Sequence, residues 1–268
     1  MARANGVREI WASGKAVVNS WLGVPSSFSA EVMAHAGWDS LVVDMQHGMI
    51  DYQMMITMLQ AISTTNTVPL VRVPWNDPAH IQKALDAGAY GIICPMINNR
   101  AEAEKFVGSC RYAPLGYRSS GPIRAALYGG ADYHMKANDI VLAFGMIETA
   151  EAMENLDEIM SVKGLDAIYI GPSDLSISYG HPPGGDKPDQ WMMDALKKVL
   201  DACNRHSVMP GIHCGAPSYA KQMIEMGFQF VTVGGDTRFL TMGAAAAVRE
   251  MRGDAPVNPA RAGASSPY

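Results

Sequence analysis

The chain has 268 residues, 48% of them hydrophobic, so it can bury one large core, and a single barrel of about 250 residues would use nearly all of it. Its net charge of −5, with Lys and Arg scattered, argues against nucleic-acid binding. No apolar run approaches the roughly 20 residues that span a membrane, and the N-terminus lacks an apolar signal core. Four cysteines without metal-type spacing are typical of a reduced, cytoplasmic protein.

Strand-like and helix-like runs alternate along almost the whole chain. The expected strands are 16–22, 40–44, 68–73, 91–95, 141–148, 167–171, 208–213 and 230–233. The expected helices are 27–36, 52–64, 78–87, 100–110, 150–161, 190–206, 217–226 and 237–249. This alternation favours an α/β fold, a single-domain (β/α)8 TIM barrel, over an open doubly wound sheet. We assign residues 1–252 to the barrel and the Pro-, Ala-, Gly- and Ser-rich stretch 253–268 to a flexible C-terminal tail.

One segment, 111–139, interrupts the alternation of strands and helices. It is too long for an ordinary connection between two elements. Its Tyr, Gly, Arg and Pro content suits an active-site loop that contains short helical pieces. We therefore expect this segment to approach the site.

Two carboxylates follow neighbouring strands in the middle of the chain. Glu148 ends the fifth expected strand and Asp174 follows the sixth, with a helix-like run between them. Such a crossover places both residues at the same carboxyl edge of a parallel sheet. Two carboxylates there repel each other unless a cation or a proton lies between them, and oxygen ligands suit Mg²⁺ or Mn²⁺. A metal site is favoured over the alternative, a salt-bridged pair that includes Arg72.

Three more polar residues lie at strand ends, where the active sites of barrels form. Asp44 is close enough in sequence to orient the imidazole of His47, which would then act as a general acid or base; the alternative is a surface histidine. Arg72 could stabilise a developing oxyanion or serve only as a structural partner of the carboxylates. Together these residues favour an enzyme.

Further residues could line the same site. The backbone N–H groups of Ser173 and Asp174, after Gly171 and a proline, could face a ligand carboxylate. Trp21, at the end of the first strand, could wall a small pocket or belong to the core. His213 ends the seventh strand, and a lone histidine in such a place is more often structural.

Several short motifs occur in order along the chain, and they resemble a known family. They include Trp21-Leu-Gly, Asp44-Met-Gln-His47, Val71-Arg72-Val-Pro-Trp-Asn-Asp-Pro, Leu85-Asp86-Ala-Gly-Ala, Ile147-Glu148-Thr and Gly171-Pro-Ser-Asp174-Leu-Ser. Together they resemble the metal-dependent class II pyruvate aldolases of the 4-hydroxy-2-oxoheptanedioate aldolase (HpcH/HpaI) family. The chain departs from the family pattern at Met45-Gln46, where the family has Gly-Glu, and at Met146, where it often has Gln.

The resemblance implies a (β/α)8 barrel assembled as a homohexamer, a trimer of dimers that exchange their last helix. It implies reversible aldol cleavage of a 4-hydroxy-2-oxo acid to pyruvate, or a related 2-oxo acid, and an aldehyde. Glu148 and Asp174 would bind Mg²⁺ or Mn²⁺, with Co²⁺ or Zn²⁺ as further possibilities. The small-molecule partners would be the 2-oxo acid and the aldehyde, with no nucleic acid and no membrane.

The resemblance also implies roles for individual residues. Arg72 would stabilise the enolate oxygen, and His47 would move protons with support from Asp44 or Asp86. The amides at Ser173 and Asp174 would hold the pyruvate carboxylate. Gly171 would belong to the same binding site, and Trp21 would line the pocket.

Three other functions stay open at this point. A Schiff-base aldolase needs a buried lysine near a strand's carboxyl end, whereas the lysines here fall on helices, before strands or in polar loops. An acyl-CoA or phosphonate-type C–C lyase or mutase could use the same two carboxylates. An inactive barrel kept as an oligomeric scaffold predicts neither metal binding nor enolisation. The presence of both His47 and Arg72 favours the aldolase.

Overall fold

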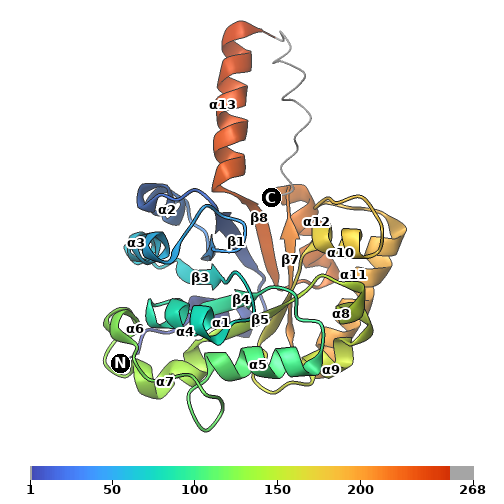
Figure 1. Cartoon of the computed structure of the whole chain (residues 1–268). Helices are drawn as coiled ribbons and strands as arrows, with labels where there is room; N and C mark the ends of the chain where they lie inside the picture. The colour runs from blue at the N-terminus through green and yellow to red at the C-terminus, as the bar shows by residue number, and fades with distance from the viewer. Residues whose placement is uncertain (1, 254–268) are drawn as a thin grey trace.

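The computed structural model describes residues 2–253, which form one closed barrel of parallel strands in chain order (Figure 1). The strands are β1 (Val17–Leu22), β2 (Ser40–Asp44), β3 (Val68–Arg72), β4 (Gly91–Cys94), β5 (Leu142–Ile147), β6 (Ala167–Ile170), β7 (Met209–Cys214) and β8 (Phe230–Gly235). The last strand closes the barrel by pairing with the first, with Phe230 opposite Val17. The predicted (β/α)8 barrel is therefore confirmed. The predicted tail lies outside the described residues from 254 onward.

The helices surround the barrel as the sequence predicted, with several additions. They are α1 (Gly6–Ala12), α2 (Ser27–Ala34), α3 (Tyr52–Ile62), α4 (Pro78–Asp86), α5 (Arg100–Cys110), α6 (Ile123–Gly129), α7 (Tyr133–Ile140), α8 (Ala150–Glu154), α9 (Leu156–Met160), α10 (Pro172–Ser178), α11 (Gln190–His206), α12 (Pro217–Met226) and α13 (Asp236–Arg252). The expected helix 150–161 is divided at Asn155 into α8 and α9. The sequence analysis missed α1 and α10, which are each seven residues long and therefore carry little periodic signal.

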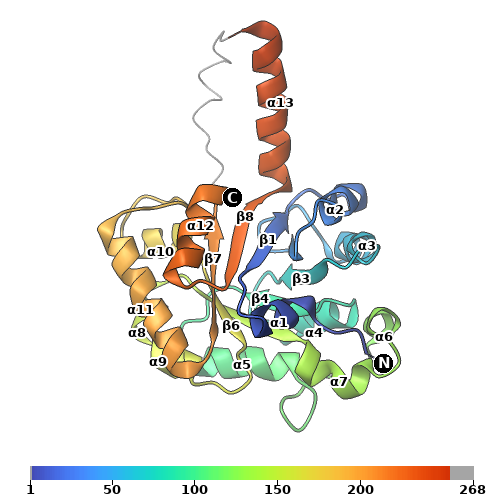
Figure 2. The same ribbon diagram turned by 180° about the vertical axis from the view of Figure 1, so that it is seen from behind.

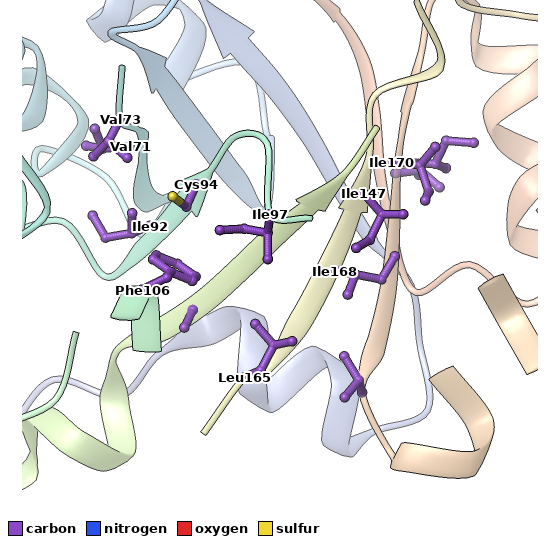
Figure 3. Packing of buried hydrophobic residues seen from close by; sticks show 14 of the residues in the cluster. Val71, Val73, Ile92, Cys94, Ile97, Phe106, Ile147, Leu165, Ile168 and Ile170 are labelled. Carbon is purple, nitrogen blue, oxygen red and sulfur yellow. The ribbon is translucent and has the colours of Figure 1, made fainter. Parts of the chain in front are cut away.

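Side chains of each strand alternate between two apolar layers, as the pleat of a strand requires. Within the barrel the filling includes Leu142, Phe144 and Met146 from β5. Ile147 and the strand residues labelled in Figure 3 belong to the second layer, between the barrel and its helices. Met146 therefore points inward, opposite to Ile147. Because both faces are buried, the strands read as continuous apolar runs.

The amino-terminal end of the barrel is closed by α1, which crosses beneath the strands (Figure 2). Val7 and Trp11 pack into the interior layer, and the Trp11 indole N–H donates to the carbonyl of Gln229 at 2.8 Å. Asn5 caps α1 and also donates to the carbonyls of Tyr90 and Ile140. The closed end leaves the carboxyl ends of the strands for a site.

The long segment 111–139 does contain short helices, α6 and α7, but it does not lie at the predicted place. It connects the end of α5 to the start of β5, at the amino-terminal end of the barrel. Arg111 binds Asp166, just before β6, and Arg118 binds Asp86 at the end of α4. The prediction of an active-site loop is therefore wrong within one chain, because composition does not reveal at which barrel end a segment lies.

The last helix, α13, projects away from the barrel beyond the carboxyl ends of the strands (Figures 1 and 2). Its first turn is anchored by the Phe239 ring, which stacks on Trp38 with 6.0 Å between ring centroids. Leu240, Met242 and Met251 further along are exposed. Within residues 2–253, none of the helices combines the length and apolar character needed to cross a membrane.

Candidate active site

Glu148 is a buried carboxylate at the carboxyl end of β5. Its side chain is 2% exposed, and its Oε1 accepts a hydrogen bond from the Met96 N–H at 2.8 Å. A Cβ at position 171 would collide with Oε2, so Gly171 allows β6 to pass close to this carboxylate. Burial raises the pKa of Glu148 to about 7, the Met96 hydrogen bond opposes that rise, and nearby Asp174 adds to it.

Asp174 lies in the first turn of α10, directly beyond β6. It lines the same narrow cavity as Glu148, which we call the carboxylate cavity. The other residues lining this cavity are Trp21, Arg72, Met146, Tyr169, Gly171, Pro172, Ser173, Gly185 and His213. The amides of Ser173 and Asp174 belong to the first turn of a helix whose N-cap, Gly171, has no side chain to accept from them. The structure therefore brings together the two carboxylates and the residues expected to bind a 2-oxo acid.

Arg72 is held rigidly in the same cavity by three contacts. Its Nε and Nη2 donate to the two carboxylate oxygens of Asp44 at 2.8 and 2.7 Å, and both side chains are buried. The guanidinium also lies over the Trp21 ring, 4.2 Å from the ring centroid. A two-point contact of this kind fixes the direction of the guanidinium as well as its position.

Asp44 also organises the turn that carries His47. Its Oδ1 accepts from the backbone N–H groups of Gln46 at 3.0 Å and His47 at 3.3 Å. The carboxylate thus acts on Arg72 and on the backbone of the turn, contacts that the sequence analysis did not predict. Burial and the Arg72 charge lower the pKa of His47, and Asp44 and Asp174 partly oppose this. A neutral imidazole is the form that can accept a proton.

A second cavity of about 220 Å³, which we call the histidine cavity, lies beside the first. It is lined by Trp21, Gly23, Asp44, His47, Gly48, Met49, His213, Gly234, Gly235, Asp236, Thr237 and Arg238. Trp21 and His213 line both cavities. None of the lysines in the described part of the chain lines either one, which agrees with the argument against a Schiff base.

Asp86 does not join this group within one chain. It is the last residue of α4, at the amino-terminal end of the barrel, and its Oδ1 accepts from Nη2 of Arg118 at 2.8 Å. His47 lies at the opposite, carboxyl end. Support of His47 by the Asp86 of the same chain is therefore ruled out by the topology of the barrel.

His213, Tyr169 and Arg238 are among the lining residues that the sequence analysis undervalued or missed. His213 belongs to β7 and lines both cavities. Its Nδ1 lies 3.0 Å from the Tyr169 hydroxyl. Arg238 belongs to the first turn of α13. The position of His213 at a strand end was a usable signal, whereas Arg238 carried none, because only the fold brings the first turn of α13 to the cavity.

The carboxylate cavity fits a divalent cation, judged by its donors. Among residues 2–253, no group of three or more His, Cys, Asp and Glu side chains is placed to enclose an ion. Glu148 and Asp174 supply two hard oxygen donors, and burial, with a further contribution from the Asp174 charge, raises the pKa of Glu148, a cost that a bound cation would offset. Two protein carboxylates that leave positions for water and substrate oxygens are an arrangement that Mg²⁺ uses.

A (β/α)8 barrel with paired carboxylates, a fixed arginine and a histidine at its carboxyl end fits a carbon–carbon lyase of the aldolase class, and the family and relatives of the chain belong to that class. The HpcH/HpaI aldolase/citrate lyase family model matches residues 19–242. The chain belongs to this family, as the resemblance predicted.

Relatives of known name cover nearly the whole chain. A hydroxypyruvate/pyruvate aldolase of Rhizorhabdus wittichii is 41% identical over 251 residues, 94% of this chain and 98% of the relative. A 4-hydroxy-2-oxo-heptane-1,7-dioate aldolase of Klebsiella pneumoniae is 38% identical, over 90% of this chain and 92% of the relative. The crystal structure of an HpcH/HpaI aldolase/citrate lyase family protein from Burkholderia cenocepacia superposes with a TM-score of 0.86, at 32% identity, covering 93% of this chain and all of that one.

Proposed function

We propose that this protein catalyses the reversible aldol cleavage of 4-hydroxy-2-oxo acids to pyruvate, or a related 2-oxo acid, and an aldehyde. The observation that carries the proposal is the meeting of Glu148, Asp174 and Arg72 in one cavity, with His47 in the adjoining one. The names of the relatives from Rhizorhabdus wittichii and Klebsiella pneumoniae support it.

The carboxylate cavity would bind the 2-oxo acid. Glu148 and Asp174 would hold Mg²⁺ or Mn²⁺, and such an ion polarises a 2-oxo group as a Lewis acid. The backbone N–H groups of Ser173 and Asp174 would donate hydrogen bonds to the substrate carboxylate, because first-turn amides are directed toward an anion at a helix start. These contacts would hold the donor in the carboxylate cavity, which shares Trp21 and His213 with the histidine cavity.

Arg72 would stabilise the charge that develops during cleavage. When the C3–C4 bond breaks, its electron pair passes into the 2-oxo acid fragment and leaves an enolate oxygen. A guanidinium already fixed by Asp44 needs little reorganisation to pair with that oxygen. The bond between Arg72 and Asp44 is thus a positioning device for the reaction.

His47 would move the proton at the aldehyde end. Its neutral imidazole would accept the proton of the C4 hydroxyl as that oxygen becomes the aldehyde carbonyl. Protonation of the enolate at C3 then completes the release of the 2-oxo acid. The lowered pKa of His47 supports this role, because it keeps the base unprotonated near neutral pH.

We further propose that the chain works as a homo-oligomer, a hexamer built as a trimer of dimers that exchange α13. The support is the projecting helix, on one side of which Leu240, Val248 and Met251 are exposed, because an apolar helix face is normally covered. A cytoplasmic setting is supported by four free, buried cysteines.

The proposal is tested by deuterium uptake into the pyruvate methyl group, followed by proton NMR. This reaction requires enolisation only, so the unknown aldehyde does not matter. We expect exchange that chelation abolishes and Mg²⁺ restores, and a loss of at least about 100-fold in Glu148→Gln. Glu151→Gln, an exposed carboxylate three residues away, is the matched control.

Two outcomes would contradict the proposal. Undiminished exchange in folded Glu148→Gln would remove the role of the carboxylate pair. No exchange from folded, metal-loaded wild-type protein would favour the acyl-CoA or phosphonate-type lyase or an inactive barrel.

A further inference from the structure

His213 lies where the two cavities meet, and its hydrogen-bond partners determine which ring nitrogen carries the hydrogen. We propose that His213 is a specificity-determining residue that accepts, through Nε2, a hydrogen bond from a hydroxyl group of the substrate beside the reacting carbons. The proposal deepens the aldolase function above and rests on it. A chain of buried hydrogen bonds fixes the imidazole tautomer.

The hydrogen-bond chain begins at Asn19, which is fully buried inside the barrel. Its amide is best oriented with the nitrogen donating to the hydroxyl and carbonyl oxygens of Ser40, at 2.8 and 3.0 Å. The amide oxygen then accepts from the Thr232 hydroxyl at 2.8 Å and from the Ser20 N–H at 3.2 Å. In this orientation the only proton of the Thr232 hydroxyl is donated to Asn19.

Thr232 must therefore act as an acceptor toward its other neighbours. The Trp21 indole N–H, which can only donate, points to its Oγ1 at 3.0 Å. The Tyr169 hydroxyl donates to the same oxygen at 2.7 Å. Burial raises the pKa of Tyr169 well above its usual range, so the phenol keeps its proton. That single proton is committed to Thr232.

The Tyr169 hydroxyl determines which nitrogen of the His213 imidazole carries the hydrogen. Because the Tyr169 proton is used, its oxygen can only accept from His213, whose Nδ1 lies 3.0 Å away. Nδ1 therefore carries the hydrogen. Burial and the charges of Arg72 and Arg238, partly opposed by Asp44, lower the pKa of His213 to about 4, so the ring is neutral. Nε2 is left as a hydrogen-bond acceptor on the side of the ring away from Tyr169.

His213 lines both cavities, and because Nδ1 is bound to Tyr169, Nε2 is the ring nitrogen left to bind a ligand there. The edge of the ring is held there by Trp21, with 5.4 Å between the centroids of the two rings. A neutral acceptor in the cavity wall favours a substrate with a hydroxyl donor over the analogue that lacks it. The hydroxyl has two sources: C3 of a hydroxylated 2-oxo acid, or the carbon beside the carbonyl of a hydroxylated aldehyde.

The experiment compares kcat/KM in the synthetic direction for matched pairs. One arm uses hydroxypyruvate against pyruvate with a fixed aldehyde, and the other uses glycolaldehyde against acetaldehyde with pyruvate. We expect His213→Leu to lower the preference for the hydroxylated member about fivefold to tenfold in one arm, which identifies the source. His213→Gln, whose amide oxygen replaces Nε2 as an acceptor, should retain most of the preference.

A second measurement reads the tautomer directly and does not depend on activity. The imidazole ¹⁵N shifts of His213, assigned by comparison with His213→Gln, should show a protonated Nδ1 and an unprotonated Nε2. Tyr169→Phe removes the acceptor of Nδ1–H and should allow the other tautomer to populate. A wild-type ring protonated at Nε2 would overturn the proposal.

The kinetic test also has a clear negative result. Unchanged preferences in both arms for folded His213→Leu would overturn the role of His213. Failure of the aldolase proposal itself is distinguished by wild-type pyruvate exchange, because a protein without any exchange fails before His213 is considered.

Discussion

The buried carboxylate of Glu148 is needed for the proposed reaction, but burying its charge lowers the stability of the fold. Buried beside Asp174, it has a pKa of about 7 in the folded chain, against about 4.3 in an unfolded one. At pH values between these two pKa values, Glu148 is therefore protonated in the folded state and ionised in the unfolded state. The contribution of this proton to the unfolding free energy is fully present below the unfolded pKa and is lost as pH rises through 7.

This pH dependence leads to a prediction for the metal-free protein. Between pH 5 and pH 8, wild type should lose up to about 3 kcal/mol of unfolding free energy relative to Glu148→Gln, whose amide does not titrate. Urea unfolding at both pH values measures the difference. Mg²⁺ should restore stability at pH 8 in wild type only. A parallel pH dependence in both proteins would contradict the raised pKa, and Glu151→Gln should behave as wild type.

The pair of Arg72 and Asp44 shows why geometry matters beyond charge. Lysine keeps the positive charge but cannot make the two-point contact seen at 2.8 and 2.7 Å. We expect Arg72→Lys to reduce pyruvate exchange at least about 100-fold and to lower stability by about 2 kcal/mol. Exchange assays and urea unfolding check both effects. Arg100→Lys, at an exposed ion pair with Glu104, is the matched control; full exchange in Arg72→Lys would remove the positioning role.

At the scale of elements, α13 carries the clearest prediction. It leaves the barrel after one anchored turn, and the exposed Leu240 and Met242 lie on the projecting part. Leu240→Asp should weaken subunit association, because it places a charge where an apolar contact is expected. Sedimentation should show a smaller particle, while Glu250→Gln on the same helix should not change it. A wild-type protein that sediments as a monomer would refute the exchange of α13.

Element types and bounds were largely predictable from sequence. Strands buried on both faces produce apolar runs such as those of β2 and β3, and capping residues such as Asp77 mark helix starts. The short α1 and α10 were missed, because one or two turns do not establish a period. The placement of 111–139 was also missed, because the end of the barrel at which a segment lies depends on which elements it connects.

At the scale of the whole molecule, the barrel gathers residues that are distant in sequence. Asp44, Arg72, Glu148 and Asp174 come from four different strand-to-helix junctions, yet they surround adjoining cavities. Parallel strands in chain order produce this meeting, since every strand ends at the same rim. α1 closes the other end, so the chemistry is confined to one opening.

The sequence by itself determined the fold class and most residues of the candidate site. Both depend on local signals: the alternation of strand and helix, and polar residues where apolar strands end. Only the tertiary structure decided that Asp44 holds Arg72, that Asp86 lies at the far end of the barrel, and that the tautomer of His213 depends on Asn19. These are contacts between strands or across the barrel interior, and hydrogen-bond direction there depends on three-dimensional neighbours rather than on spacing along the chain.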